Sequence, residues 1–410
     1  MCSTIMDQYP YSLFQVYGVE LEYMVVDQKT LDVAPIVDLL FQDIHGEITS
    51  SIEEDVLTLD NELALHVVEM KTTHPQQTLA PLPQLFHQKV RDLNRFLSKR
   101  GACLMPSAMH PWMNPTKETK LWPHGSSEIY DTFNQIFDCS GHGWSNLQST
   151  HLNLPFGSEE EFVRLHRSIR IVLPLIPMIC ASSPFFEGKS AGVKDKRLEV
   201  YQHNCQRVFS VTGHIIPETC VSYDDYQTKI LGRIYKDLAL LDPKGVLRNE
   251  WVNARGAITR FERGSIEIRL IDIQENPYQD IAVITALSKL IQWLIDKDSH
   301  YDQLSEETLK SILYLGIEHA EDAFITDSQY LAIFGIHNHQ IKAKDLWMHI
   351  INELIEVPKE SRPFLDLIIK EGTLATRLQK RVNTPVNHKV LYDTYLTLCH
   401  CLEKGEPFIP

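Results

Sequence analysis

Residues 264–272 read Gly-Ser-Ile-Glu-Ile-Arg-Leu-Ile-Asp and predict the strand around which the chain is organised. Apolar residues at positions 266, 268 and 270 alternate with polar ones, which is the pattern of a half-buried strand. Side chains two positions apart on a strand point to the same face, so Glu267 and Arg269 stand side by side. One of them can hold a cation and the other an anion.

A second stretch, Tyr17–Tyr23, has the same form. Glu20 and Glu22 share one face of the predicted strand, and the odd-numbered apolar residues share the other. Acidic side chains along one sheet face call for cations there. For either motif taken alone, the alternative is an ordinary solvated face of an antiparallel sheet.

Strand and helix patterns succeed one another without strict alternation, which predicts an α+β fold with a curved antiparallel sheet flanked by helices. A further expectation is a sheet-bearing domain over residues 1–300 with a helical segment, 301–410, packed on it. Strands are expected over 14–26, 52–59, 63–70, 102–105 and 146–156. Helices are expected over 81–99, 128–137, 159–179 (with Ser158 as N-cap), 195–209, 223–240, 277–295, 304–316, 341–356, 362–370, 372–382 and 388–403.

Composition excludes some classes of function. The 410 residues carry a net charge of −15, which argues against a nucleic-acid partner. The most apolar run, 171–186, contains three prolines and is shorter than the ~20 residues of a membrane span, so no membrane association is expected. Eight cysteines without CxxC pairs, and no secretory signal, predict reduced thiols in the cytoplasm. Cys399-His400-Cys401 could bind a metal, but a helix end is favoured.

Five carboxylates and one imidazole form the candidate metal site: Glu20, Glu22, Glu62, Glu69, Glu267 and His151. Like charges cannot converge as free anions, and two or three divalent cations would remove the repulsion. Oxygen ligands favour Mg²⁺ or Mn²⁺. Glu62 and Glu69 are an odd number of residues apart, so either Glu62 lies outside the strand or a bulge intervenes.

Arginines are the candidate anion binders, because the chain contains neither Gly-x4-Gly-Lys-Ser/Thr nor Gly-x-Gly-x-x-Gly. A nucleotide would have to be held by metals and guanidinium groups. Arg255 and Arg260 precede the strand at spacings that let them reach its mouth, where they could bind phosphate or carboxylate in bidentate fashion. Surface arginines in a loop are the alternative.

Several blocks, in this order, resemble glutamate–cysteine ligase family 2, whose carboxylate–amine ligases are related to glutamine synthetase. The resemblance covers roughly residues 14–290. It rests on Gly18-Val19-Glu20-Leu21-Glu22, Glu62 with Glu69-Met70-Lys71-Thr72, Met109-His110-Pro111-Trp112-Met113, His142–Phe156, Asn249–Ile258 and Ser265-Ile266-Glu267-Ile268-Arg269.

The resemblance implies a glutamine synthetase-like fold, in which a curved sheet forms an open funnel. Glu20, Glu22, Glu62, Glu69 and Glu267 then resemble metal ligands, His151 a residue at the metal–phosphate end, and Arg269 a residue on the transferred phosphoryl group. By position, we add Arg255 and Glu267 to Arg269 as catalytic candidates. Arg260, His151 and Arg269 are the nucleotide-binding candidates.

The implied chemistry uses ATP and Mg²⁺ (or Mn²⁺) to join the γ-carboxylate of glutamate to the amine of cysteine through an acyl phosphate, a step of glutathione biosynthesis. The loop around Trp112 and the helices after residue 300 are the candidate lid. Alternatives are a ligase for another amine, a phosphotransferase of the guanidino-kinase type, and a non-catalytic binder. Expected partners are small-molecule substrates, and self-association is left open.

Overall fold

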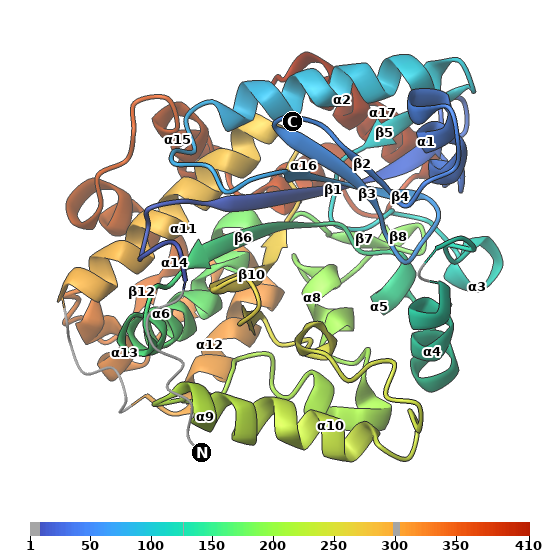
Figure 1. The fold of residues 1–410 in the computed structure, drawn as a ribbon. Coiled ribbons are helices and arrows are strands. Elements are labelled where there is room, and N and C mark those ends of the chain that lie inside the picture. Colours follow the sequence, from blue (N-terminus) through green and yellow to red (C-terminus); the bar gives the residue numbers. More distant parts are fainter. Residues whose placement is uncertain (1–8, 126, 298–303) are drawn as a thin grey trace.

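The computed structural model describes residues 9–125, 127–297 and 304–410. The domain boundary expected at residues 300 and 301 therefore lies outside the described residues. Figure 1 shows a central sheet with helices on both sides of it.

Eight strands form an antiparallel sheet in the order β2-β3-β4-β1-β6-β10-β9, with β5 added to β1, as far as the described residues show. The bounds are β1 Gly18–Asp27, β2 Ser51–Glu53, β3 Leu57–Asn61, β4 Val67–Thr72, β5 Ala102–Met105, β6 Ser149–Pro155, β9 Ala257–Arg260 and β10 Ser265–Asp272. The predicted α+β fold with a large antiparallel sheet is confirmed.

The alternation predicted for the two key strands is present. Ile266, Ile268 and Leu270 of β10 are fully buried, as are the odd-numbered residues 19, 21 and 23 of β1. This apolar face packs against α11 (Pro277–Lys297), where the hydroxyl of Tyr23 lies 3.4 Å from the Asp280 carboxylate. Burying one face fixes the register, so the acidic residues are directed to the other face.

Helices α2 (Leu82–Ser98) and α6 (Glu159–Val172) both pack along α11 (Pro277–Lys297). The α2 residues at helical spacing, from Leu82 to Leu97, are buried as predicted. Ser158 caps α6 by accepting a hydrogen bond from the Glu161 N–H. The helix ends earlier than expected, because Pro174 cannot continue the backbone hydrogen bonds, and a 3₁₀ turn and α7 (Pro177–Cys180) follow.

Shorter elements complete the sheet region. The helix expected over 195–209 is α8 (Lys196–Tyr201) followed by a separate 3₁₀ segment, Gln206–Val211. The one expected over 223–240 is present as a continuous helical run over 223–238 that contains a π-helical turn, Gln227–Gly232. The remaining bounds are α1 Val37–His45, α3 Pro115–Glu118, α4 Ser127–Phe137, α5 His142–Ser145, β7 Phe185–Phe186, β8 Lys189–Ser190, α9 Tyr223–Tyr226, α10 Arg233–Leu238 and a 3₁₀ turn, Glu250–Val252.

The region from residue 304 onward is mainly helical, as predicted. Its helices are α12 Glu306–His319, α13 Ser328–Ile333, α14 Ala343–His349 with a π-helical continuation Ile350–Leu354, α15 Arg362–Glu371, α16 Leu374–Val382 and α17 His388–Lys404. The expectation that strands stop there is wrong in one detail, because Phe324–Ile325 (β11) and Ile341–Lys342 (β12) form a short ladder.

Buried polar contacts tie this helical region to the rest of the chain. The hydroxyl of Tyr330 donates to the Ile171 carbonyl at 2.7 Å. Arg377 forms an ion pair with Glu275, and both side chains are completely buried. The buried apolar residues of α12 to α15 belong to the core that supports the sheet, whereas most of those of α16 and α17 form a second cluster with Met24, Val26 and Met105. The helical region therefore packs on the sheet region directly.

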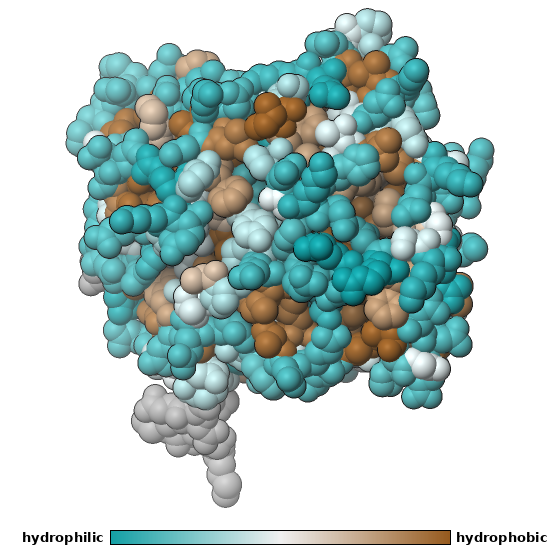
Figure 2. All heavy atoms as spheres, turned by 90° about the horizontal axis from the view of Figure 1, so that it is seen from above, coloured by the Kyte–Doolittle hydropathy of each residue, from teal (hydrophilic) through white to brown (hydrophobic). Residues whose placement is uncertain are grey.

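The seven described cysteines are free thiols, and Cys399 and Cys401 are buried in α17. Cys2 lies outside the described residues. In the described part of the chain, no helix combines the length and apolarity needed to cross a membrane. The face shown in Figure 2 is mostly hydrophilic, with apolar side chains in scattered patches.

Candidate functional site

Strand pairing brings the predicted acidic residues onto one face of the sheet, which we call the site face. In the antiparallel register Glu20 lies opposite His151, Glu22 opposite Glu69, and Glu267 opposite an asparagine of β6. Residues opposite one another on neighbouring strands project to the same side. Four strands therefore contribute to one cluster, as the sequence predicted.

Glu62 joins this cluster from outside the regular strands. The β3–β4 ladder ends at Asn61 paired with Val68, so Glu62 lies in the connection between the two strands. The odd spacing between Glu62 and Glu69 is explained without a bulge, because alternation does not extend into the connection. This is the first of the two explanations offered above.

Two sets of three side chains could each hold a metal ion. In each set the ligand atoms lie within 4.8 Å of one another. The first set is Glu20, Glu69 and His151, and the second is Glu22, Glu62 and Glu69. Glu69 belongs to both sets, so two adjacent cations would share its carboxylate.

The buried carboxylates of the cluster repel one another when no cation is bound, and their pKa values are shifted accordingly. Burial, together with the charge of Glu22, raises the pKa of Glu62 to about 8. Burial and the charge of Glu20 raise the pKa of Glu69 well above its usual range. Carboxylates that are buried against one another in this way suit a divalent cation, which would replace the bound protons. The oxygen-rich donor set fits Mg²⁺ or Mn²⁺.

Both ring nitrogens of His151 have hydrogen-bond partners among the side chains of the site face. Its Nδ1 lies 2.9 Å from the Glu20 carboxylate, and its Nε2 lies 2.9 Å from the hydroxyl of Ser149. Burial opposes a charge on the imidazole, but the hydrogen bond to Glu20 and the charges of Glu22 and Glu20 outweigh it, so the pKa of His151 is raised. Burial likewise opposes ionisation of Glu20, whereas His151 and Lys71 lower its pKa.

Glu267 lies beside the cluster between two guanidinium groups. It accepts a hydrogen bond from Nη1 of Arg260 at 2.8 Å, and Nε of Arg269 lies 3.0 Å from its other oxygen. That second oxygen is 3.9 Å from Nδ1 of His151. Glu267 belongs to neither three-residue set, although it is within reach of His151. Arg260 and Arg269 therefore both reach the site face, as predicted.

Arg255 does not join them, and its predicted catalytic role is not supported. Its Nε and Nη2 form a bidentate ion pair with Glu218, both at 2.7 Å, and its Nη1 donates to the Ser210 carbonyl. Only 1% of the residue is exposed, and it lines neither of the cavities described next. The sequence could not show this, because Glu218 lies 37 positions away.

Two cavities adjoin the cluster. The larger, which we call the aromatic cavity, has a volume of about 390 Å³ and reaches Glu22, Glu62, His151 and Arg269. The other, the basic cavity, has a volume of about 310 Å³ and reaches Glu20, with Lys71 and Arg263 among its lining residues. Glu20 and Glu22 are neighbours on one strand face, so the cavities lie on either side of the acidic cluster.

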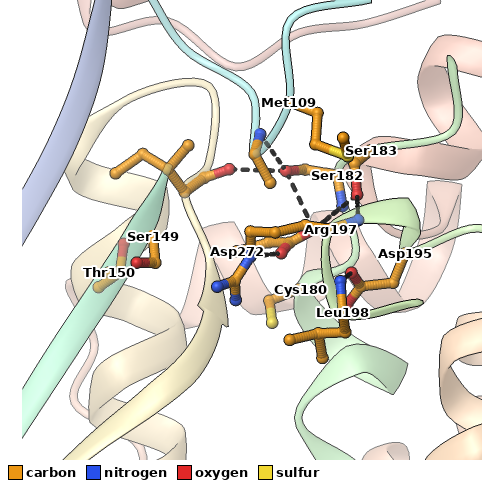
Figure 3. A network of polar contacts seen from close by, with 12 residues as sticks. Met109, Ser149, Thr150, Cys180, Ser182, Ser183, Asp195, Arg197, Leu198 and Asp272 are labelled. Atoms are coloured by element: carbon orange, nitrogen blue, oxygen red, sulfur yellow. Dashed lines mark hydrogen bonds and ion pairs between the residues drawn. The ribbon is translucent and has the colours of Figure 1, made fainter. Parts of the chain in front are cut away.

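Arg197 is a residue of the aromatic cavity that the sequence reasoning missed. It is 2% exposed, and its Nε forms an ion pair with the buried Asp272. Figure 3 shows the Asp272 carboxylate joined both to Arg197 and to serines that precede α8. Nη1 of Arg197 donates to the backbone carbonyl of Arg269 at 3.3 Å, while Nη2 is buried without a hydrogen-bond partner in the described part of the chain. That nitrogen is free for a ligand.

A bulge in β10 positions Asp272 for this role. Ile268 pairs with Leu152 and Ile271 pairs with Thr150, so three steps on β10 match two on β6. The extra residue reverses the alternation beyond it, and Asp272 lies opposite Ser149 on the site face. Without the bulge, Asp272 would face the core.

The expected lid is not where the sequence placed it. The described residues lining the aromatic cavity all lie between Glu22 and Arg269, so none comes from the helices after residue 300. Trp112 packs instead against His388 and Tyr392 of α17, and its indole donates to Asp32. The walls of the cavity come from α4, α5, the turn around Trp251, residues 63–67 and the segment from Arg197 to Cys205.

Comparison with known proteins gives the family. A model of glutamate–cysteine ligase family 2 matches residues 16–320. An uncharacterized protein of Archaeoglobus fulgidus is 30% identical over 96% of this chain and 100% of its own length. A protein of Herpetosiphon aurantiacus with the provisional name glutamate–cysteine ligase 2 is 19% identical over 88% of this chain and 86% of its own length.

Solved structures show the same fold. The glutamate–cysteine ligase of Francisella tularensis in complex with AMP superposes with a TM-score of 0.60 at 12% identity, covering 96% of this chain and 90% of that one. A bifunctional glutathione synthetase of Pasteurella multocida gives 0.59 at 13% identity, over 96% of this chain and 53% of that one. The family match spans the strands that carry the acidic cluster. The chain therefore belongs to glutamate–cysteine ligase family 2, a family of carboxylate–amine ligases.

Proposed function

We propose that this protein is an ATP-dependent ligase that joins the γ-carboxylate of glutamate to the amine of cysteine or of another small molecule. The observation that carries the proposal is the buried acidic cluster on the site face, with Arg269 beside it and a cavity on either side. Such an arrangement brings two substrates together from opposite directions. Family membership supports the reaction class.

The basic cavity suits the nucleotide. Lys71 and Arg263 both line it, and Arg263 is exposed and forms no ion pair with any residue that the structure describes. A triphosphate carries several negative charges and needs cations along its length. The aromatic cavity suits the carboxylate substrate, because Arg197 presents a free guanidinium nitrogen there.

The two three-residue sets would hold divalent cations, with Glu69 bridging them. When bound, the cations would neutralise the phosphate oxygens and the carboxylates that meet at the site face. The protein contributes a rigid sheet that keeps the ligands in place. It also contributes Arg260 and Arg269, whose positions are set by their contacts with Glu267.

The reaction then requires two displacements. A carboxylate oxygen of the donor attacks the γ-phosphorus of ATP, the bond to the bridging oxygen breaks, and ADP leaves. The amine nitrogen then attacks the acyl carbon, phosphate leaves with its oxygen, and the nitrogen loses a proton. Arg269 can balance the charge that develops on the phosphoryl oxygens, and Arg197 can hold a carboxylate of the donor. Positioning supplies most of the rate enhancement in such transfers.

Water must be excluded between the two steps, since it would hydrolyse the acyl phosphate. The aromatic cavity provides that protection through half-buried apolar side chains close to the cluster. Phe133 of α4 and Trp144 of α5 contact each other there, with ring centroids 5.3 Å apart.

The test is ADP release with ATP, Mg²⁺ and glutamate in the presence of each common amino acid in turn, with the product mass determined. We expect ADP and amide in equal amounts. A glutamate sulfoximine should cause slow, ATP-dependent inactivation, because a tetrahedral mimic resembles the transition state more than the substrate does. ADP formation with a phosphorylated product and no amide would instead identify a phosphotransferase of the guanidino-kinase type.

A matched pair of variants distinguishes an effect on the acidic cluster from a general effect of the substitution on folding. Glu22→Gln removes one charge from the cluster without changing side-chain volume, and it should abolish turnover. Glu54→Gln makes the same chemical change at a surface carboxylate that is paired with Lys89, and turnover should be unchanged. Full activity of the Glu22 variant at saturating Mg²⁺ would refute the assignment of the cluster.

A further inference from the structure

One wall of the aromatic cavity is built from large rings. Tyr130 and Phe133 come from α4, Trp144 from α5, and Trp251 from the turn after Asn249. Phe133 lies between the two indoles, with ring centroids 5.3 Å from Trp144 and 5.9 Å from Trp251. All four side chains are half-buried, so each keeps a surface open to the cavity. Apolar surface gathered in a pocket in this way indicates a ligand that covers it.

The wall starts next to the acidic cluster. The hydroxyl of Tyr130 accepts a hydrogen bond from Asn61 at 3.0 Å, and Asn61 directly precedes Glu62. A substrate whose reacting atom lies at the cluster can therefore rest its remaining part on the rings. The donor carboxylate does not need this surface, because its charged groups are matched by Arg197 and Arg269, which also line the cavity.

The size of the cavity also exceeds what a thiol-sized side chain requires. An apolar cavity of about 150 Å³ is enough to hold a benzene molecule. The aromatic cavity has a volume of about 390 Å³, so it can hold a donor of the size of glutamate together with a ring-sized group on the acceptor. A cysteine side chain would leave most of the aromatic surface in contact with water, at a cost that scales with exposed apolar area.

We propose that the acceptor amine of this ligase carries a large apolar side chain, preferably an aromatic one, which packs on Tyr130, Phe133, Trp144 and Trp251. This inference rests on the proposed ligase function and specifies its second substrate. The amine nitrogen displaces phosphate from the acyl carbon as described above, and the product is an amide of the donor with an apolar amine.

Adenine is the other flat group that could occupy the rings. That arrangement would place the triphosphate against the carboxylates of Glu22 and Glu62 on its way to the cluster, while the exposed Arg263 in the basic cavity was left without an anion from the described residues. Charge complementarity therefore favours the amine on the aromatic wall.

The experiment measures kcat/KM for phenylalanine, tryptophan, leucine, alanine and cysteine as acceptors, with glutamate, ATP and Mg²⁺, by ADP release and product mass. We expect phenylalanine or tryptophan to exceed both alanine and cysteine by at least about tenfold, the selectivity that a few buried methylene-sized contacts provide. A preference for cysteine would overturn this inference and leave the ligase function standing.

Variants of Phe133 test whether the aromatic wall causes the preference for aromatic acceptors. In Phe133→Ala, the ratio of kcat/KM for phenylalanine to that for alanine should fall by at least about tenfold, mainly through KM. Phe133→Leu keeps an apolar side chain, guards against loss of folding, and should give an intermediate ratio. Phe209 is an exposed phenylalanine outside the cavity, and Phe209→Ala should leave the ratio unchanged. An unchanged ratio in both Phe133 variants would refute the inference.

A binding measurement distinguishes this inference from failure of the ligase function itself. Phenylalanine, but not cysteine, should alter the tryptophan fluorescence of the full-length protein, and the change should be smaller in Trp144→Phe, which leaves Trp251 as the remaining indole of the wall. If no amide forms with any amino acid but this fluorescence response is present, the cavity assignment stands and the reaction assignment falls. If adenosine alters the fluorescence and phenylalanine does not, the wall binds the nucleotide and the inference is wrong.

Discussion

The acidic cluster predicts that Mg²⁺ stabilises the protein in a pH-dependent way. The pKa of Glu62 is raised from 4.5 to about 8 by burial and by the charge of Glu22. A carboxyl group whose pKa is raised by folding contributes stability that is fully present below pH 4.5 and is lost as the pH rises through about 8. Removing the proton from Glu62 in the metal-free protein therefore costs on the order of 5 kcal/mol.

Bound Mg²⁺ should offset this loss, but only where Glu62 is ionised. At about one hundred times its dissociation constant, a ligand stabilises by ~2.7 kcal/mol, which corresponds to about 3 °C in Tm for 410 residues. Each pH unit below about 8 weakens Mg²⁺ binding by about tenfold, because a proton must leave Glu62 first. The same Mg²⁺ concentration should therefore shift Tm by about 3 °C near pH 9 and by less than about 1 °C near pH 6.

The assay is differential scanning fluorimetry with and without Mg²⁺ at both pH values. Glu62→Gln should raise the Tm of the metal-free protein near pH 9, by as much as ~6 °C, and should remove most of the Mg²⁺ response. Glu54→Gln is the matched control and should behave as the wild type. Equal Mg²⁺ shifts at both pH values, or a Glu62 variant that responds to Mg²⁺ like the wild type, would refute the reasoning.

Three further substitutions test other parts of the structure. Arg269→Lys keeps the charge but loses the planar fork, so kcat should fall by more than about tenfold, or ~1.4 kcal/mol; an unchanged rate would leave Arg269 as a sheet-face residue. Arg197→Lys should raise KM for the carboxylate donor by at least about tenfold and KM for ATP by less than about threefold, and equal rises in both would contradict the assigned contact. Arg377→Ala breaks a fully buried ion pair and should lower the free energy of unfolding by ~3–5 kcal/mol in denaturant titration, whereas Arg362→Ala, in an exposed pair, should cost less than about 1 kcal/mol.

The parts of the site that follow from local alternation could be predicted from the sequence. Glu20 and Glu22 had to share a face because the odd-numbered residues of β1 are apolar, and Glu267 with Arg269 followed for the same reason. Which strands pair with one another, and in which register, is not specified by any local sequence pattern. There the resemblance to a family supplied the missing information, and the pairing of Glu20 with His151 agrees with it.

The misplaced residues depend on contacts between distant segments. Arg255 has the spacing of an anion-binding arginine, but its partner Glu218 comes from a loop that no motif marks. Trp112 was expected in a lid because it lies in a loop rich in proline and aromatic residues, whereas α17 covers it. Arg197 was missed because its position depends on Asp272, and the bulge in β10 reverses the face on which Asp272 lies.

That bulge also determines which changes in the length of β10 the site can accept. Leu270 lies in the irregular step between Ile268 and Ile271, where β10 has one residue more than β6. Deleting Leu270 would remove the extra residue and leave Ile271 opposite Thr150 and Asp272 opposite Ser149, so both side chains would keep their faces. A residue inserted in the regular pairing, between Ile271 and Asp272, would instead turn Asp272 away from the site face and remove the anchor of Arg197. Relatives that keep the arginine-anchoring aspartate are therefore expected to differ from β10 in length only at the irregular step.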